Sequence, residues 1–418
     1  MATIASPLRF IPVLILLLFG SPIPAVPAAN PHGTGHNAIA RGGVTIGVKR
    51  NPNYRPNGPA EYARALKKWG AKVPGALQDS LVAMRDTVGE VGAKSVHDDR
   101  EYVSSVGFGT PSQWLDVTLD TGSSDVWVFS SETRLSLDAD RPRWVIENST
   151  TAKRVENATW SIVYADGSIA RGNVWTDTIS LGGTTVPNAT LESAVNVSPE
   201  LSGDRDSAGV FGLAYSLPTG TSPQQPAVLP ALLQHLPQAL FTVDLRHGSN
   251  ASSSSSAANN SAYTFGYIDS SRHLSSSPIQ YTPLLPNATY WHIAYNGLHL
   301  GGHREWYLSS AWSAGVDTGT ALLLLGRFAT TLYYGAVPGA RQNWNMGGLW
   351  EFPCDLRDGN GTAVALPDLD IGFPGGAKGD GLVATIPGRY LNHTVMEDNT
   401  TMCMGGLQEV GFAAKDLN

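Results

Sequence analysis

The sequence contains very little cysteine, which excludes disulfide-rich scaffolds and thiolate metal clusters. Cys354 and Cys403 are the only two cysteines among 418 residues. In an oxidising compartment we expect them to pair with each other. The closed loop would stabilise the second half of the chain by about 3–4 kcal/mol. No cysteine would then remain for nucleophilic catalysis.

Sequence signals of metal, serine or nucleotide chemistry are also missing. The ten histidines are scattered and form no His-Glu-x-x-His motif, so a metallohydrolase is poorly supported. No Gly-x-Ser-x-Gly stands between a strand and a helix, and there is no glycine-rich phosphate loop. Serine hydrolases and nucleotide-binding proteins are therefore poorly supported too. We expect no metal site and no cofactor.

Long apolar runs are absent except near the N-terminus. Arg9 precedes a short apolar stretch, Ile11 to Phe19, and small residues follow up to Ala28. This stretch is too short to span a bilayer, so it predicts a signal peptide over residues 1–28 and not a membrane anchor. An extracellular glycoprotein also fits the ten Asn-x-Ser/Thr sequons, at Asn148, Asn157, Asn188, Asn196, Asn250, Asn259, Asn287, Asn360, Asn392 and Asn399.

Charged residues are scarce, at 15% of the chain, whereas 45 glycines and 27 prolines are present. Apolar runs of strand length alternate with turns rich in Gly, Asn and Pro, and helical periodicity is rare. This pattern predicts an all-β protein, and the length allows two lobes, each with its own core. The low-complexity tract 250–261 is expected to be a surface loop near the boundary between the lobes.

The few charges are unevenly distributed. Residues 29–94 contain ten Lys and Arg against four Asp and Glu, whereas residues 95–418 contain 17 against 31. A basic segment before an acidic body predicts a docked propeptide over residues 29–97, which acid would loosen. Within it, residues 60–69 predict a short helix with Tyr62, Leu66 and Trp69 on one face. Lys67 and Lys68 either reach an acidic cleft or form a solvated pair.

Nucleic acid and anionic lipid are weaker candidates for a partner of this basic segment. Secretion argues against nucleic acid, and too few charges cluster together for binding to a lipid surface. We therefore expect no nucleic-acid partner.

An internal repeat is the strongest signal in the sequence. Leu115-Asp-Val-Thr-Leu-Asp120-Thr-Gly-Ser123 recurs as Ser313-Ala-Gly-Val-Asp317-Thr-Gly-Thr320. One Asp-Thr-Gly suits any tight turn, but each copy follows a strand-like segment and precedes an apolar run. Two such copies predict two related lobes, each contributing one acid.

The repeated residue types suit metal-free hydrolysis of an amide. One group must take a proton from water, and another must give a proton to the carbonyl oxygen and then to the leaving nitrogen. Two adjacent carboxyls that share one proton perform both tasks, because like charges close together do not both ionise readily. We therefore predict Asp120 and Asp317 as the catalytic pair. Ser123 and Thr320 are predicted to orient their outer oxygens.

These motifs resemble those of the pepsin-like aspartic peptidases, most closely the fungal secreted branch. The similarity extends through Val106-Gly-Phe-Gly-Thr-Pro, Asp120-Thr-Gly-Ser-Ser-Asp-Val-Trp-Val128, Gly209-Val-Phe-Gly212 and Tyr290-Trp-His-Ile293. The resemblance implies a mainly-β, bilobal fold of double-ψ β-barrel-type lobes, over residues 98–270 and 271–418. It also implies a secreted monomeric endopeptidase that binds peptide and protein substrates and is inhibited by its own propeptide.

The same resemblance implies a β-hairpin flap over the substrate. The matching segment is Trp160-Ser-Ile-Val-Tyr-Ala-Asp-Gly-Ser168, so Tyr164 would be the flap tyrosine, with its hydroxyl near Trp127. Asp166, Gly167 and Ser168 would also face the substrate. Asp166 is similar to the acidic residue with which some fungal members accept lysine beside the cleaved bond. Ala165 replaces the usual glycine.

The second lobe departs from the family pattern. Only 15 residues follow Cys403, and about two dozen residues that carry the last core strands are missing between Gln408 and Glu409. Loss of these strands would leave polar backbone groups near Asp317 without partners, at about 1–3 kcal/mol each. An incorrectly spliced gene model explains the gap most simply. The alternative is an impaired homologue that binds peptides or a partner protein without turnover.

Overall fold

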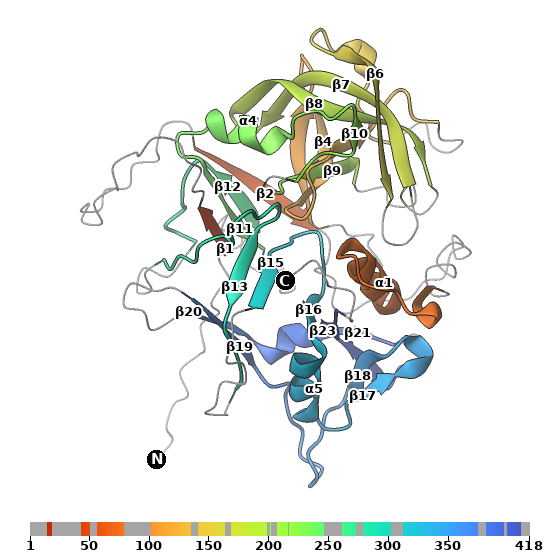
Figure 1. Ribbon diagram of the computed structural model, residues 1–418, viewed down its shortest axis with the longest axis vertical. Helices are drawn as coiled ribbons and strands as arrows, with labels where there is room; N and C mark the ends of the chain where they lie inside the picture. The colour runs from red at the N-terminus through yellow and green to blue at the C-terminus, as the bar shows by residue number, and fades with distance from the viewer. Residues whose placement is uncertain are drawn as a thin grey trace, which may run out of the picture.

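A computed structural model describes residues 15–18, 43–50, 57–78, 102–134, 141–163, 169–198, 201, 207–215, 217–245, 261–272, 279–301, 312–374, 382–396 and 399–410. Two β-rich lobes lie one above the other in Figure 1. The predicted mainly-β, two-lobed architecture is confirmed.

The first lobe is built from long antiparallel strands that carry alternating buried residues. Its core includes Phe108, Val117, Trp144, Leu191 and Phe211. The elements are β3 (Tyr102–Phe108), β4 (Gln113–Asp120), β5 (Val126–Phe129), η1 (Ile146–Asn148), β6 (Lys153–Val163), β7 (Ile169–Leu181), β8 (Thr184–Val197), β9 (Gly209–Gly212), β10 (Thr221–Ser222) and α4 (Val228–Gln234).

One large sheet continues from this lobe into earlier and later parts of the chain. Its order is β1-β11-β12-β2-β3-β4-β9-β5-β8-β7-β6-β10. Strand β2 lies between β12 and β3, so a segment before residue 98 joins two strands of the body. The additional strands are β1 (Ile15–Leu18), β2 (Val44–Arg50), β11 (Leu240–Asp244) and β12 (Ala262–Phe265).

The second lobe has its own apolar core and several smaller sheets. Tyr333, Phe352, Leu369 and Leu407 are buried in that core. Its elements are β13 (His292–Tyr295), β14 (Gly297–Leu300), β15 (Trp312–Gly315), β16 (Leu323–Leu325), α5 (Arg327–Gly335), β17 (Arg341–Asn343), η3 (Trp344–Met346), β18 (Leu349–Pro353), β19 (Leu369–Phe373), β20 (Leu382–Ile386), η4 (Gly388–Leu391), β21 (Asn392–Val395), β22 (Met402–Gly405) and β23 (Leu407–Glu409).

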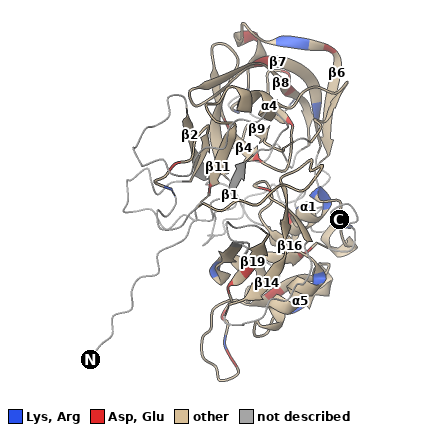
Figure 2. Cartoon of the chain, turned by 60° about the vertical axis from the view of Figure 1, so that its left-hand side comes forward, with Lys and Arg blue, Asp and Glu red and all other residues tan. Residues whose placement is uncertain are grey.

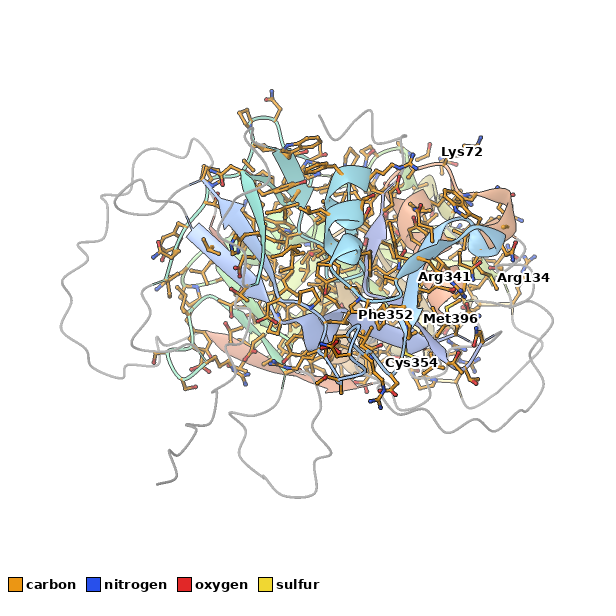
Figure 3. The ribbon with its side chains drawn as sticks, turned by 90° about the horizontal axis from the view of Figure 1, so that it is seen from below. Lys72, Arg134, Arg341, Phe352, Cys354 and Met396 are labelled. Atoms are coloured by element: carbon orange, nitrogen blue, oxygen red, sulfur yellow. A yellow bond between two sulfur atoms is a disulfide. The ribbon has the colours of Figure 1, made fainter. Side chains whose placement is uncertain are left out.

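The expected disulfide is present in the second lobe. Cys354 and Cys403 are bonded, with their Cα atoms 5.0 Å apart. The bond connects the end of β18 to β22, two strands that already pair through Phe352 and Cys403. In Figure 3, Phe352 and Cys354 are labelled close together at this edge of the lobe.

Helix α1 (Gly58–Lys68) confirms the predicted helix before the body. Asn57 caps it by accepting a hydrogen bond from the Ala60 N–H at 3.0 Å, and Pro59 occupies its first turn. The apolar face, which includes Tyr62 and Leu66, is buried against residues of the second lobe: Leu322, Leu349, Met396, Met402 and Met404. Figure 1 shows α1 beside the blue strands of that lobe.

The two lobes are not equally complete. In the first lobe, β9 pairs in parallel with β4 and antiparallel with β5, and β5 pairs in parallel with β8. In the second, β16 pairs in parallel with β23, as β5 does with β8. Within the described part of the chain, β15 pairs only with β13, and no strand corresponds to β9. This agrees with the predicted absence of core strands from the second lobe.

Candidate active site

Asp120 is placed by the end of a buried strand and the turn that follows it. Strand β4 ends at this residue, and its neighbour β9 runs parallel through Gly212. The turn returns the Gly122 N–H to Asp120 Oδ1 at 2.9 Å, and the Ser123 hydroxyl donates to Oδ2 at 2.6 Å. These bonds fix the carboxylate, and they agree with the orienting contact predicted for Ser123.

Asp317 repeats this arrangement from the second lobe. It follows β15, accepts the Gly319 N–H on Oδ1 at 2.9 Å and accepts the Thr320 hydroxyl on Oδ2. The two turns approach so closely that a Cβ on Gly122 would collide with the Asp317 carboxylate, and a Cβ on Gly319 with that of Asp120. The structure therefore brings Asp120 and Asp317 together and shows why each motif requires glycine.

The threonines of the two motifs tie the turns to each other. The Thr121 N–H donates to Thr318 Oγ1 at 3.1 Å, and the Thr318 N–H donates to Thr121 Oγ1 at 2.9 Å. Each hydroxyl in turn donates at 2.9 Å to a carbonyl of the opposite lobe, Val316 or Leu119. No role for these threonines was predicted from the sequence, although their occurrence in both copies of the motif could have indicated one.

Lys68, at the end of α1, lies between the two acids. Its Nζ is 3.1 Å from Asp120 Oδ1 and 2.9 Å from Asp317 Oδ2. The contact resolves the open choice at Lys67 and Lys68, because Lys68 reaches the acids whereas Lys67 is exposed. Figure 2 shows basic positions of α1 at the junction of the lobes.

The two carboxyls have different pKa values because their surroundings differ. Burial alone would raise the pKa of Asp120, but the charge of Lys68, with hydrogen bonds from Asp317, Ser123 and Gly122, lowers it to about 2. For Asp317, burial and the charge of Asp120 raise the pKa to about 6, against the opposing charge of Lys68. Between these values the pair holds one proton, as the predicted chemistry requires.

Trp69 places an aromatic side chain next to the acids. Its ring centroid lies 5.3 Å from that of Tyr290 and 6.4 Å from that of His292. It also covers Gly315, at the end of β15, where a Cβ would collide with the indole. The segment that supplies Lys68 thus also packs an aromatic ring against β15, which ends two residues before Asp317.

The segment predicted to be a flap joins strands β6 and β7, which form a hairpin. The two strands pair up to Val163 and Ile169. Tyr164, Asp166, Gly167 and Ser168, at the predicted tip, lie outside the described residues. Trp127 is buried and stacks on Trp160 of β6, three residues before the tip end of that strand, with ring centroids 6.0 Å apart. The predicted contact between Tyr164 and Trp127 remains a prediction.

The described residues contain no candidate metal site. No group of three or more His, Cys, Asp or Glu in that part of the chain is arranged to hold a metal ion.

Of the helices in the described part, none combines the length and apolar character needed to cross a bilayer.

Comparison with known proteins agrees with this geometry. The family model for eukaryotic aspartyl proteases matches residues 101–415. Endothiapepsin of Cryphonectria parasitica is 33% identical over 396 residues, covering 93% of this chain and 85% of the relative. Aspergillopepsin-1 of Aspergillus fumigatus is 32% identical over 396 residues, covering 94% and 89%.

A solved structure shows the same fold. The crystal structure of the aspartic proteinase from Irpex lacteus has a TM-score of 0.54 at 24% identity, covering 76% of this chain and 86% of that one. With the family model matched over most of its length, and with two Asp-Thr-Gly turns meeting between two lobes, the chain belongs to the eukaryotic aspartyl protease family.

Proposed function

We propose that the chain is a secreted aspartic endopeptidase, made as a zymogen, in which Asp120 and Asp317 activate water. The contact of a single ammonium group with both carboxylates, at 3.1 and 2.9 Å, carries this proposal. A position within hydrogen-bonding distance of both acids is where an attacking water has to lie. In the described form Lys68 Nζ occupies that position, so it stands in for the water.

The proposed reaction needs only the two carboxyls and one proton. The ionised carboxyl takes a proton from water as the oxygen attacks the peptide carbonyl carbon, and the protonated carboxyl gives its proton to the carbonyl oxygen. The tetrahedral intermediate then breaks its C–N bond. The nitrogen receives the proton held by the dyad, and a hydroxyl of the intermediate gives its proton to the other carboxyl as the new carboxylic acid forms. One proton again remains on the pair, so the cycle closes without metal or cofactor. The aspartic-protease dyad is the standard instance of such sharing.

The flap would complete the site. We propose that Tyr164, Asp166, Gly167 and Ser168 close over the peptide, and that Trp127 supports the hairpin through Trp160. The stacking of these two tryptophans supports this role. Acceptance of lysine beside the cleaved bond is proposed for Asp166, and Asp166→Ala would lower cleavage at lysine sites selectively.

Residues 29–97 are proposed to be an inhibitory propeptide. Lys68 neutralises the dyad and Trp69 covers Gly315, so a peptide cannot reach the acids while α1 is docked. Burial of the apolar face of α1 against the second lobe adds hydrophobic stabilisation to this ion pairing. The proposal implies that the free enzyme forms only after this segment leaves.

The direct test is peptide hydrolysis by the purified full-length chain after acid treatment. We expect release of peptides from denatured haemoglobin at about pH 3–4, where the dyad holds its proton, and inhibition by a transition-state analogue. Tight binding of the analogue without hydrolysis would instead establish a peptide binder without turnover. The relatives found give no support to that alternative.

Secretion predicts glycans at three exposed asparagines. Asn157, Asn188 and Asn287 each begin an Asn-Ala-Thr sequon, are exposed, and have φ values of 60°, 51° and 59°. Asn157 and Asn188 lie at irregularities within β6 and β8, and Asn287 lies in a turn. Exposed side chains at such positions are accessible to a glycosyl transferase. Enzymatic removal of N-glycans from the secreted chain should lower its mass, and Asn157→Gln should remove one glycan. A secreted chain with no mass shift would contradict this prediction.

A further inference from the structure

Glu192 is a buried acid in the first lobe that the proposed reaction does not use. It lies on β8, where it pairs with Trp127 of β5 and Val174 of β7, and its exposed fraction is 0%. Neither carboxylate oxygen has a hydrogen-bond partner in the described part of the structure. A buried carboxylate without a donor is strongly unfavourable, so this group needs an explanation.

Asp125 is the titratable side chain that faces Glu192. Its carboxyl lies within hydrogen-bonding reach of the Glu192 carboxyl, and it is itself only 7% exposed. Asp125 Oδ1 already accepts the Gly220 N–H. Its main-chain carbonyl accepts the Gly212 N–H at 2.9 Å, which ties the residues after the Asp120 turn to β9.

Among the described residues, no Lys, Arg or His forms an ion pair with Asp125 or Glu192. Burial, and then the charge of Asp125, raise the pKa of Glu192 well above its ordinary range. The nearby Glu132 and Arg154 pair with each other, and Glu132 accepts the hydroxyl of Ser193. Because successive strand residues face opposite sides of a sheet, that cluster lies on the face opposite Glu192. The Trp160 indole N–H is also engaged, by the Ser193 carbonyl.

We propose that Asp125 and Glu192 share one proton, and that the resulting hydrogen bond positions the turn that carries Asp120. One carboxyl donates its O–H to the other, so a single proton supplies the missing donor and removes one of two adjacent negative charges. Asp125 and Glu192 are thus positioning residues of the first lobe. Their pair makes the fold of that lobe dependent on acid, independently of the catalytic dyad.

The sign of the expected pH dependence follows from linkage. The folded chain holds this proton more tightly than the unfolded chain, in which a glutamate has a pKa of about 4.3. The stabilisation is therefore fully present below that value and is lost as pH rises toward the higher pKa of the folded state. Neutral and alkaline solutions should weaken the first lobe.

The test compares thermal unfolding of full-length wild type and Glu192→Gln at about pH 4.5 and pH 8. Glutamine keeps a donor for Asp125 but cannot ionise. We expect the fall in Tm between the two pH values to shrink by about 4 °C or more in Glu192→Gln. Glu147→Gln, which changes an exposed acid of the same lobe, should keep the wild-type difference. An equal pH dependence in wild type and Glu192→Gln would overturn the proposal.

A second measurement does not depend on the folding of the variant. Infrared spectra of the wild-type chain at about pH 7.5 should contain the carbonyl-stretch band of a protonated, buried carboxylic acid. Asp317→Asn should retain this band, which assigns it away from the catalytic dyad. Absence of the band from folded wild type would overturn the proposal even if Glu192→Gln cannot be purified. Neither readout uses peptidase activity, so each stands if the proposed function fails.

Discussion

Replacing Asp317 with asparagine is expected to lower peptide hydrolysis by about 10⁴-fold, because an amide can neither hold nor transfer the shared proton. Asparagine has nearly the same shape: its carbonyl oxygen can accept the Gly319 N–H, and its amide N–H can donate to the Thr320 hydroxyl. The cleft should therefore persist while the chemistry is lost. Cleavage of a fluorogenic peptide at acid pH measures the effect, and conversion of the chain to a shorter form reports it independently.

The matched control for this prediction is Asp355→Asn, which removes a carboxylate from the same lobe. The Asp355 side chain is 72% exposed and contacts only Arg357 among the ion pairs of the described residues. Its hydrolysis rate and unfolding temperature should equal those of wild type. Activity of Asp317→Asn within tenfold of wild type, with an unchanged unfolding temperature, would contradict the assignment of Asp317 to the dyad.

Replacing Lys68 with glutamine is expected to open the cleft of the full-length chain at near-neutral pH. The substitution removes the cation between two buried acids, and breaking such a pair weakens the docked state by roughly 3–5 kcal/mol. Because Lys68 is 26% exposed, we expect the lower part of this range. A labelled transition-state analogue should then bind Lys68→Gln about 10²-fold more tightly than wild type at pH 6.

Lys67→Gln provides the control for this second prediction. Lys67 is the adjacent, exposed position of α1, so its loss should leave analogue binding unchanged. The advantage of Lys68→Gln should also diminish as pH falls. Docking lowers the pKa of Asp120, so its stabilisation exists above the undocked pKa and is lost when the dyad gains protons. Equal binding by Lys68→Gln and wild type at pH 6 would contradict inhibition through Lys68.

The catalytic geometry was largely predictable because it depends on a local motif that occurs twice. Strand ends, the Asp-Thr-Gly turns and the hydroxyls three residues after each acid are all encoded within a few positions. The reciprocal bonds of Thr121 and Thr318 were not predicted, because they form between residues 197 apart. Which lysine reaches the acids was also undecided, since helix phase alone does not show what the helix packs against.

The order of the strands in the large sheet could not be predicted from the sequence, for a related reason. Nothing in residues 44–50 indicates that they pair with both β12 and β3, because strand partners are chosen by burial in the assembled sheet. The apolar face of α1 was visible as periodicity, but its site on the second lobe was not. The signal peptide, the propeptide bounds, the lobe bounds and the flap tip remain predictions.

The missing counterpart of β9 was predicted, and it leaves a visible difference between the two turns. Asp120, Thr121 and Gly122 are buried, whereas Val316, Thr318 and Gly319 are partly or fully exposed. A strand beside β15 would cover the second turn as β9 covers the first. Sequencing the transcript across the codons for Gln408 and Glu409 would show whether such a strand is encoded.

Strand β2 makes any maturation of this protein a rearrangement of its architecture. It contributes registered pairs to β12 on one side and β3 on the other. Its first half pairs with β12 and its second half with β3, so its departure would leave amides and carbonyls of both strands without partners in the middle of the largest sheet. These edges would be open to insertion by another extended segment or to self-association. A product shortened past β2 would therefore be a topological variant of its precursor, and its half-life in solution would depend on how quickly that vacancy is refilled.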